Sequence, residues 1–533
     1  MRIKFQTCAG YFAAFFLIIP SVIWNLFDKS VWPWDQSWYA EISTDLNYLL
    51  KNDIDQWWGL MTDAFGIKAP AIAWLGQFFL FFANNPNSIE FSLLLSVSVI
   101  QFLSLVLIYN INYRINKSIS FNSILLVGSA PLFIAMGHQY LVESFQLFFV
   151  TLIMWITIAS PEEEKNKTFI LLGIAMILGM AIKITSPLYV VFYTFGILYN
   201  QFAIKKIRGE NKSKNLIWIF LFLLITSITF SWYFKNFNKI LTFAKEMSLS
   251  QKALNYGNVD TFTNKFIYWL NALLNNFFIP KIFFILCLVI IFTSCVKKNK
   301  WEYGRNETIF LILTTLNILL VITVFSLSIN QENRYLLPVL PMLAIALMFI
   351  EKKLSRSLKI FITILFLIQF AIINSISFNL PTPIKSLCYW LKPLNKNSEI
   401  KDTLNKLVFE IGKNSVDQSI NVVGVDIQWL NANTLSYFSS KVRPKNNKKI
   451  FFTSLGYAES DTKQSIKRIE EIKPNFFITL TNKDLLKNDD FLNRTSKAAS
   501  EYVSNNVNYK KYNFDNTDNI VIYKKNNMGL IIN

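Results

Sequence analysis

The chain contains little of what most metal and disulfide sites require. Its 533 residues include one histidine, His138, and four cysteines, Cys8, Cys287, Cys295 and Cys388. The cysteines are scattered without the spacing of a zinc site, and only Cys388 falls in the polar C-terminal part. We therefore expect no structural zinc and no disulfide within that part. No glycine-rich phosphate loop opens a helix there either, so the sequence indicates no nucleotide site.

Acidic residues are also few, with 34 Asp and Glu against 53 Lys and Arg and a net charge of +19. Such an excess of positive charge is typical of nucleic-acid-binding proteins, but no fold or motif of that kind accompanies it. Much of the excess lies in short loops between apolar runs, where membrane topology explains it. We expect no nucleic-acid partner.

Apolar side chains are abundant instead. Hydrophobic residues make up 53% of the chain, including 49 Phe and 14 Trp, which exceeds the composition of ordinary soluble domains. Apolar runs of roughly twenty residues suit transmembrane helices. The pattern predicts a mostly α-helical, polytopic membrane protein with about eleven spans: 8–27, 91–111, 119–137, 140–159, 168–186, 188–204, 214–234, 279–296, 306–328, 335–350 and 358–378.

The charged loops predict the orientation of these spans. With eleven spans, four basic loops fall on one side of the membrane, which the positive-inside rule identifies as cytoplasmic. Loops 28–90 and 235–278 and the C-terminal tail then face outward. The short apolar stretch 70–83 would break this alternation, so we interpret it as an interfacial or half-inserted helix. The four basic loops contain these residues: Arg114, Lys117, Lys205, Lys206, Arg208, Lys212, Lys214, Lys297, Lys298, Lys300, Arg305, Lys352, Lys353, Arg356 and Lys359.

The tail changes character and is rich in Lys, Asn and Asp. Strand-like segments at 421–426, 450–453 and 475–480 alternate with helix-like segments at 431–441 and 461–473. This alternation predicts a small α/β domain with a parallel sheet, to which 519–523 adds an edge strand. We therefore divide the chain into a transmembrane domain, 1–379, and a soluble extracytoplasmic α/β domain, 380–533.

The first outward loop carries the most informative motif, with Asp35, Tyr39, Ala40 and Glu41 in the pattern D-x-x-x-Y-A-E. It resembles the first extracytoplasmic loop of the GT-C glycosyltransferases, membrane enzymes that use polyprenyl-phosphate sugars. The resemblance implies that Asp35 is the catalytic base and that Glu41 holds a neighbouring helix or cation. The alternative is that Asp35 caps the helix that begins here, because Asp is a good N-cap residue.

A second segment, 68–77, is similar to a stretch of the lipid A aminoarabinose transferases and protein O-mannosyltransferases. By this resemblance Lys68 contacts the phosphate of a lipid-linked donor, a task for which an ammonium is a suitable point charge. Otherwise Lys68 is an interfacial lysine whose charged end reaches the headgroups.

Two further candidates lie at the outward end of the third expected span and the start of the fourth. Glu143 matches the position of an acidic residue in the related enzymes, and its apolar neighbours would make exposure to lipid costly. It either belongs to the site or makes a structural hydrogen bond. His138 is either a substrate-binding residue or, as a lone histidine more often is, a hydrogen-bonded surface residue.

The last candidates are two cations. Arg334 belongs to an Arg-Tyr-x-x-Pro motif, which in the family precedes a late span, and would face outward to hold the donor phosphate with two hydrogen bonds. The alternative is an arginine that anchors a helix end at the headgroups. Lys183 matches a lysine of the family near the outward end of the fifth expected span.

The sequence departs from the family pattern at three positions. Gln36 replaces an acidic residue that often follows the first Asp, Trp38 replaces an arginine of some relatives, and Ile67 replaces a glutamate. The last two changes put the phosphate contacts and the identity of the sugar in doubt. The loss of one acid weakens the case for a divalent metal, which needs several oxygen ligands. We expect no cofactor, and a divalent metal is the weakly supported alternative.

Together these features predict a glycosyltransferase of the cytoplasmic membrane. Its donor is a polyprenyl-phosphate sugar, its acceptor is an envelope lipid, glycan or protein, and its site opens outward beneath a tail domain that caps the site or binds the acceptor. The alternatives are a transporter of lipid-linked sugars, which needs no proton-accepting carboxylate, and a non-catalytic envelope scaffold on the same fold.

Overall fold

The structure is a computed structural model of the full chain. It describes these residues: 2–83, 85–116, 120–160, 165–200, 216–249, 251–280, 282–286, 288, 304–382, 388–415, 419–446, 448–487, 490–514 and 519–526. Contacts divide the chain into two compact units. The helical unit comprises Met1–Leu26, Trp58–Leu75 and Leu93–Leu394. The mixed unit comprises Phe27–Trp57, Gly76–Ser92 and Asn395–Asn533.

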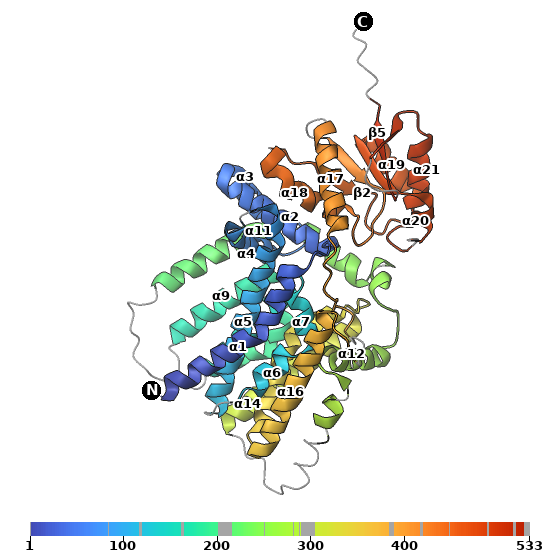
Figure 1. Ribbon diagram of the computed structural model, residues 1–533. Helices are drawn as coiled ribbons and strands as arrows, with labels where there is room; N and C mark the ends of the chain where they lie inside the picture. The colour runs from blue at the N-terminus through green and yellow to red at the C-terminus, as the bar shows by residue number, and fades with distance from the viewer. Residues whose placement is uncertain are drawn as a thin grey trace. The chain divides into compact units, whose positions relative to one another are not determined.

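The helical unit is built from α-helices joined by short 3-10 turns (Figure 1). Its core consists of Leu, Ile, Val and Phe side chains, together with fully buried aromatic residues such as Trp232, Trp269 and Tyr193. Its elements are, in order: α1 (Arg2–Phe27), α5 (Ile89–Asn116), α6 (Asn122–Gly128), α7 (Pro131–Gly137), α8 (Glu143–Ala159), α9 (Lys165–Ile182), η3 (Ser186–Val190), α10 (Val191–Tyr199), α11 (Leu216–Leu249), η6 (Gln251–Tyr256), α12 (Phe262–Phe277), α14 (Arg305–Leu327), η7 (Asn333–Val339), α15 (Leu340–Glu351) and α16 (Arg356–Ser377).

Five segments of the described chain are long and apolar enough to cross a membrane. They contain α1, α5, α14, η7 with α15, and α16, and four shorter apolar helices accompany them. The chain is therefore a multi-pass membrane protein, as the sequence predicted. The count of eleven spans stays a prediction, since most of the expected span 279–296 and the end of 188–204 lie outside the described residues.

Two expected spans differ from the helices that form. The span expected at 119–137 is two short helices, because Pro131 lacks an N–H and ends one helix while starting the next at α7. The span expected at 214–234 continues as α11 to Leu249. At 34 residues α11 is about 51 Å long, well beyond the hydrocarbon core of about 30 Å. Its last turns therefore carry polar side chains.

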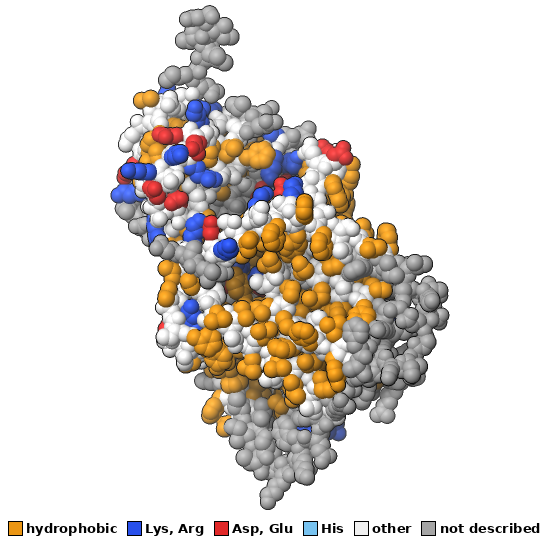
Figure 2. Space-filling model, turned by 180° about the vertical axis from the view of Figure 1, so that it is seen from behind, with side chains coloured by type: hydrophobic (Ala, Val, Ile, Leu, Met, Phe, Trp, Pro, Cys, Tyr) orange, Lys and Arg blue, Asp and Glu red, His pale blue; other side chains and the backbone are white. Residues whose placement is uncertain are grey.

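The surface of the helical unit is strongly apolar. In Figure 2 hydrophobic side chains cover most of the face of this unit, whereas charged side chains of both signs gather over the C-terminal part of the mixed unit. Phe12, Phe220, Phe230 and Phe234 are each more than 60% exposed. A surface of this kind is stable only when lipid or protein covers it.

The mixed unit contains a five-stranded sheet in the order β2-β1-β3-β5-β4. The first three strands are parallel and the last two pair antiparallel, so the expected parallel α/β sheet forms in its first half. The prediction that β5 forms the edge of the sheet is wrong. A further strand, β4, which the sequence did not indicate, pairs with β5 and forms that edge. The strands are: β1 (Ile420–Val423), β2 (Phe451–Ser454), β3 (Phe476–Leu480), β4 (Tyr509–Tyr512) and β5 (Ile520–Lys525).

Helices accompany the sheet in the order the sequence predicted, with α18 following β1 and α19 following β2. They are α17 (Glu399–Asn414), α18 (Ala432–Asn446), α19 (Thr462–Ile472), α20 (Asn482–Lys487) and α21 (Ser496–Asn505). In α19 Ile469 is buried beside Val422 and Phe477, whereas Ile466 and Ile472 on the same face are partly buried.

The mixed unit also includes much of the first loop. Its helix α2 (Trp34–Asn52) packs along α18. Thr434 donates a hydrogen bond to the Trp32 carbonyl at 3.1 Å, and the Arg443 guanidinium lies 4.1 Å from the centre of the Tyr48 ring. Contacts thus group residues 27–57 with the tail. The domain boundary expected between residues 379 and 380 stays a prediction.

Four short elements complete the loop. Helix α3 (Ile54–Asp63) is followed by α4 (Ala71–Phe79) and the 3-10 turn η1 (Leu80–Phe82), which occupy the stretch expected to be an interfacial helix, and then by the 3-10 turn η2 (Pro86–Ser88). Phe78, Phe81 and Phe82 are at least half exposed. Placement at the membrane surface would cover these rings, and it stays a prediction.

Candidate active site

Three residues predicted from the sequence meet at the start of α8. Glu143 is the first residue of this helix and is almost fully buried. Lys183 donates a hydrogen bond to its Oε1 at 3.3 Å, and the Arg334 Nε lies 3.6 Å from the same oxygen. Among the described residues no group bonds to Oε2 of Glu143, although that oxygen is buried. We call Glu143, Lys183 and Arg334, together with Lys68, the cation cluster.

Aromatic rings hold the two cations in place. The ammonium of Lys183 lies 3.8 Å from the centre of the Tyr335 ring, and the Arg334 guanidinium lies 5.1 Å from that of Trp390. Tyr189, in η3, donates a hydrogen bond to the Tyr335 carbonyl at 2.7 Å. Cation–π contacts of this kind stabilise charges that are partly removed from water, so they help to orient both cations.

Lys68 is carried by a loop that α11 fastens. The Trp232 indole donates a hydrogen bond to the Ala64 carbonyl at 2.8 Å, and Asn236 donates one to the Thr62 carbonyl at 3.3 Å. Phe65 and Gly66 have positive φ angles of 62° and 67°, which turn the chain sharply just before Lys68. Lys68 lies near enough to Lys183 for their charges to interact.

The balance of charge in the cluster favours an anion. Lys183 and Arg334 lie beside one buried carboxylate, Glu143, while Glu332 pairs with Arg334 at 3.6 Å. Lys68 adds a third cation, whose charge interacts with that of Lys183. A phosphate suits both lysine and arginine donors, and its negative charge would relieve the repulsion between these cations.

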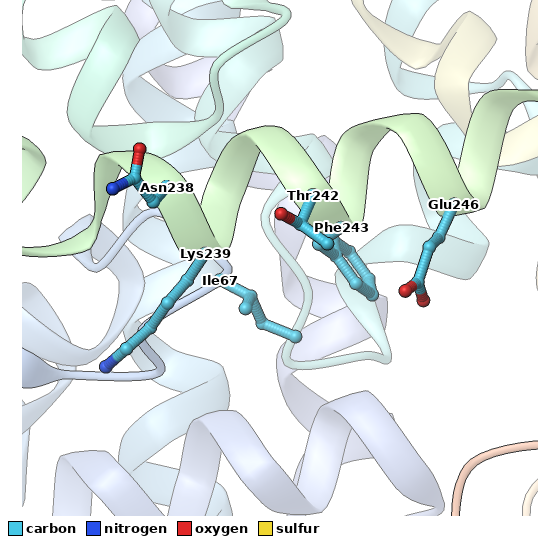
Figure 3. Close-up of a pocket in the computed structure, with 6 residues that line it drawn as sticks. All are labelled: Ile67, Asn238, Lys239, Thr242, Phe243 and Glu246. Atoms are coloured by element: carbon cyan, nitrogen blue, oxygen red, sulfur yellow. The ribbon is translucent and has the colours of Figure 1, made fainter.

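A pocket of about 460 Å³ opens beside the Lys68 loop. Ile67, which precedes Lys68, forms one wall, and one face of α11 forms the other (Figure 3). The face consists of Asn238, Lys239, Thr242, Phe243 and Glu246, which recur at helical spacing. We call this cavity the α11 pocket. Its wall is both polar and aromatic, which suits a sugar or another amphiphilic ligand.

Comparison with known proteins agrees with this architecture. Residues 67–233 match the family described as dolichyl-phosphate-mannose-protein mannosyltransferase. ArnT from Cupriavidus metallidurans in the apo state superposes with a TM-score of 0.56 at 12% identity, covering 97% of this chain and 98% of that one. The same protein bound to undecaprenyl phosphate gives 0.53 at 12% identity, covering 96% and 97%. The chain has the GT-C fold.

Two other comparisons complete the picture. The archaeal oligosaccharyltransferase AglB from Archaeoglobus fulgidus, in complex with an inhibitory peptide and a dolichol-phosphate, gives a TM-score of 0.46 at 10% identity, covering 98% of this chain and 75% of that one. A search of curated proteins by sequence gave no match. The matched segment 67–233 of this GT-C protein contains Lys68, Glu143 and Lys183 but neither Asp35 nor Arg334.

Asp35, Tyr39 and Glu41 of the GT-C motif lie on α2, in the mixed unit. The N-cap of α2 is Pro33, and Asp35 is the second residue of the helix, so the capping interpretation of Asp35 is wrong. Tyr39 is buried. Glu41 forms an ion pair with Lys449 at 2.8 Å, as expected of a residue that holds a cation. Its role in the reaction stays a prediction.

His138 is not a surface residue. It is 5% exposed and stacks on Trp24, with ring centres 4.1 Å apart. Neither ring nitrogen has a hydrogen-bond partner among the described residues. The expectation of a hydrogen-bonded surface histidine is therefore wrong, because the apolar end of α7 and the Trp24 ring enclose the imidazole.

Metal ligands do not gather in the part of the chain that the structure describes, which contains no group of three or more His, Cys, Asp or Glu side chains placed to share an ion. The expectation of a site without a metal stays a prediction. The cation cluster would repel a divalent cation.

Sequence reasoning missed several residues that shape these sites. Trp390 and Tyr189 contact the cations or the residues that hold them, and Lys449 pairs with Glu41 and Asp45. None of them stands in a recognisable motif. Lys449 follows a basic run in a polar tail, where a lysine that completes a buried ion pair is indistinguishable from a solvated one.

Proposed function

We propose that the chain is a membrane glycosyltransferase that uses a polyprenyl-phosphate sugar. The observation that carries the proposal is the cation cluster, in which Lys183 and Arg334 lie beside a buried carboxylate and the charge of Lys68 interacts with that of Lys183. The matched family is described by its dolichyl-phosphate mannose donor, and ArnT has been crystallised with undecaprenyl phosphate. A phosphate of the same kind would neutralise the cluster of this chain, and undecaprenyl phosphate is the carrier we expect.

The proposed reaction is an inverting displacement. Asp35 accepts the proton of the acceptor nucleophile as general base, and the nucleophile attacks the anomeric carbon of the sugar. The bond from that carbon to the phosphate oxygen breaks, and its electron pair leaves with the lipid phosphate. Lys68 and Arg334 stabilise the negative charge that grows on the phosphate. Glu143 orients the two cations Lys183 and Arg334 and positions the acceptor or the base.

The proposed site opens to the outer face of the cytoplasmic membrane. The tail domain, 380–533 by the sequence, is then extracytoplasmic together with the first loop. The acceptor is an envelope lipid, glycan or protein. The transferred sugar is a hexose or a pentose.

The test compares envelope glycolipids and glycoproteins by mass spectrometry in cells with and without the protein. Complementation with wild type should restore a glycosylated product, whereas Asp35→Asn should lower it by about a hundredfold or more, because general-base catalysis contributes at least that much. Asp55→Asn is the matched control, since Asp55 is the second residue of α3 as Asp35 is of α2. It should behave as wild type.

Folding gives a second control. An Asp in the first turn stabilises a helix by about 0.3–1 kcal/mol, so both variants should be inserted and should melt close to wild type. Full product formation by Asp35→Asn would remove Asp35 as the base. Movement of the lipid-linked sugar across the membrane without transfer of the sugar would indicate a transporter.

A further inference from the structure

The first turn of α2 has an unusual backbone. Trp34, its first residue, has a φ of 35°, a region that bulky side chains rarely adopt. The residue that follows is Asp35, the proposed base. Such a conformation persists only when surrounding contacts hold it, and it is often found where a site needs one fixed geometry.

A carboxylate of the tail domain holds Trp34. The Trp34 indole Nε1 donates a hydrogen bond of 2.7 Å to Oδ1 of Asp426, although the two residues are 392 positions apart. Asp426 follows β1, and its own backbone is fixed by Asn493. The Asp426 amide donates to Asn493 Oδ1 at 2.7 Å, and Asn493 Nδ2 donates to the Asp426 carbonyl at 3.1 Å. The acceptor of the indole hydrogen bond is therefore itself well ordered.

Helix α18 holds the residues just before Trp34. The Trp32 carbonyl accepts hydrogen bonds from Thr434, on α18, and from Ser37, on α2. The ring of Trp32 stacks on that of Tyr437, with centres 5.9 Å apart and planes 9° apart. Contacts from β1 and from α18 thus meet on residues 32–34, immediately before Asp35.

The charge on Asp426 strengthens this contact at neutral pH. Burial raises the pKa of Asp426 to about 6; the Trp34 hydrogen bond lowers it and the nearby carboxylate of Asp490 raises it further. At pH 7 Asp426 is mostly ionised, and a hydrogen bond to an ionised acceptor is shorter and stronger than a neutral one.

We propose that Asp426 is a positioning residue that fixes the first turn of α2 through Trp34 and thereby orients the carboxylate of Asp35. The tail domain then takes part in the reaction by ordering the proposed base, rather than only by capping the site or binding acceptor. The inference rests on the proposed function where it concerns Asp35. The hydrogen bond and the backbone geometry support it independently of the reaction.

Hydrogen–deuterium exchange on the full-length protein in detergent tests the coupling without any substrate. Asp426→Ala should raise amide exchange in the peptide that covers residues 33–40 at least fivefold, with little change in α19. Trp34→Phe, which keeps an aromatic ring but removes the indole N–H donor, should have the same effect. Glu471→Gln, a carboxylate change at an exposed position of α19, is the control and should leave residues 33–40 unchanged. Unchanged exchange in Asp426→Ala would overturn the inference.

Product formation in the complementation assay then tests the coupling to catalysis. Asp426→Ala and Trp34→Phe should each lower the product about tenfold or more, and the double variant should be no worse than either alone, because both remove the same contact. Asp426→Asn should keep much of the activity, since its amide oxygen still accepts from Trp34, and it remains informative if Asp426→Ala fails to fold. Multiplied losses in the double variant, or equal losses in the Asn and Ala variants, would contradict a role through Trp34.

The two proposals fail in different ways. If Asp35→Asn retains product formation while exchange rises in Asp426→Ala, the base assignment fails and the coupling of Asp426 to the first turn stands. If Asp35→Asn is inactive and exchange is unchanged in Asp426→Ala, the base stands and the positioning role fails.

Discussion

In the cation cluster the Glu143 carboxylate partly neutralises the neighbouring cations. This partial neutralisation suits a site that must bind an anion and then release it. The negative charge of Glu143 offsets the positive charges of Lys183 and Arg334. Because Glu143 is buried, its carboxylate needs such partners. A phosphate that reaches the cations must compete with the carboxylate for the same donors. Oε2 of Glu143 is buried and has no hydrogen-bond partner in the described part of the chain, so it could accept a hydrogen bond from a hydroxyl of the sugar or of the acceptor.

Binding of undecaprenyl phosphate should respond to the cluster charges. Lys68→Ala and Lys183→Ala should each weaken binding about tenfold, which corresponds to a loss of about 1.4 kcal/mol. Lys68→Arg should restore part of the affinity, because it keeps the charge. Native mass spectrometry in detergent can measure the bound fraction.

Lys235→Ala is the control for this prediction, since Lys235 pairs with Asp63 at a half-exposed position of the same unit. It should bind the lipid phosphate as wild type does. Equal losses in all three alanine variants would indicate that only the total charge of the protein matters, and the cluster would lose its assignment.

Among the elements, α11 links two parts of the candidate site. Its middle fastens the Lys68 loop through Trp232 and Asn236, and its last turns form the wall of the α11 pocket. A donor whose phosphate lies at Lys68 would place its neighbouring sugar or the acceptor close to this pocket, because Ile67 belongs to both. We expect the pocket to be occupied during the reaction.

Filling the α11 pocket should therefore inhibit the enzyme. Thr242→Trp introduces a large ring into the cavity and should lower product formation at least tenfold. Leu241→Trp adds a ring of the same size one position earlier, outside the residues that line the pocket, and should have little effect. If mass spectrometry finds as much product with Thr242→Trp as with Leu241→Trp, the pocket has no part in the reaction.

At the scale of the whole molecule, the surfaces of the two units differ in composition. Exposed phenylalanine and leucine residues dominate the helical unit, while charged residues of both signs gather over the C-terminal part of the mixed unit (Figure 2). A bilayer would cover the apolar surface, and water would surround the charged one. The predicted orientation places the charged part outside the cell membrane.

Thiol labelling can test this orientation in a variant whose four cysteines are replaced by alanine. Val507→Cys, at a position 78% exposed in the tail, should react with a membrane-impermeant maleimide in spheroplasts. Ser357→Cys, exposed at the start of α16 beside a basic loop, should react only after the membrane is permeabilised. The reverse labelling pattern would overturn both the orientation and the outward site.

The sequence by itself determined that the chain is a multi-pass helical membrane protein, that strands and helices alternate in the first part of the tail, and which four residues are candidates for the cation cluster. Apolar runs and short motifs are local signals, so Lys68, Glu143, Lys183 and Arg334 were recognisable one at a time. Local signals also misled, because the pattern could not show that Pro131 would divide a span or that His138 would be enclosed by Trp24.

Only the tertiary structure decided which residues meet. Arg334 reaches Glu143 across 191 positions of the chain, and Asp426 reaches Trp34 across 392. Neither pairing leaves a trace in composition or periodicity, because an ion pair or an indole hydrogen bond depends on how helices and loops pack and not on the neighbours of each residue in the sequence. For the same reason the sequence did not show that α2 of the first loop packs against α18 of the tail.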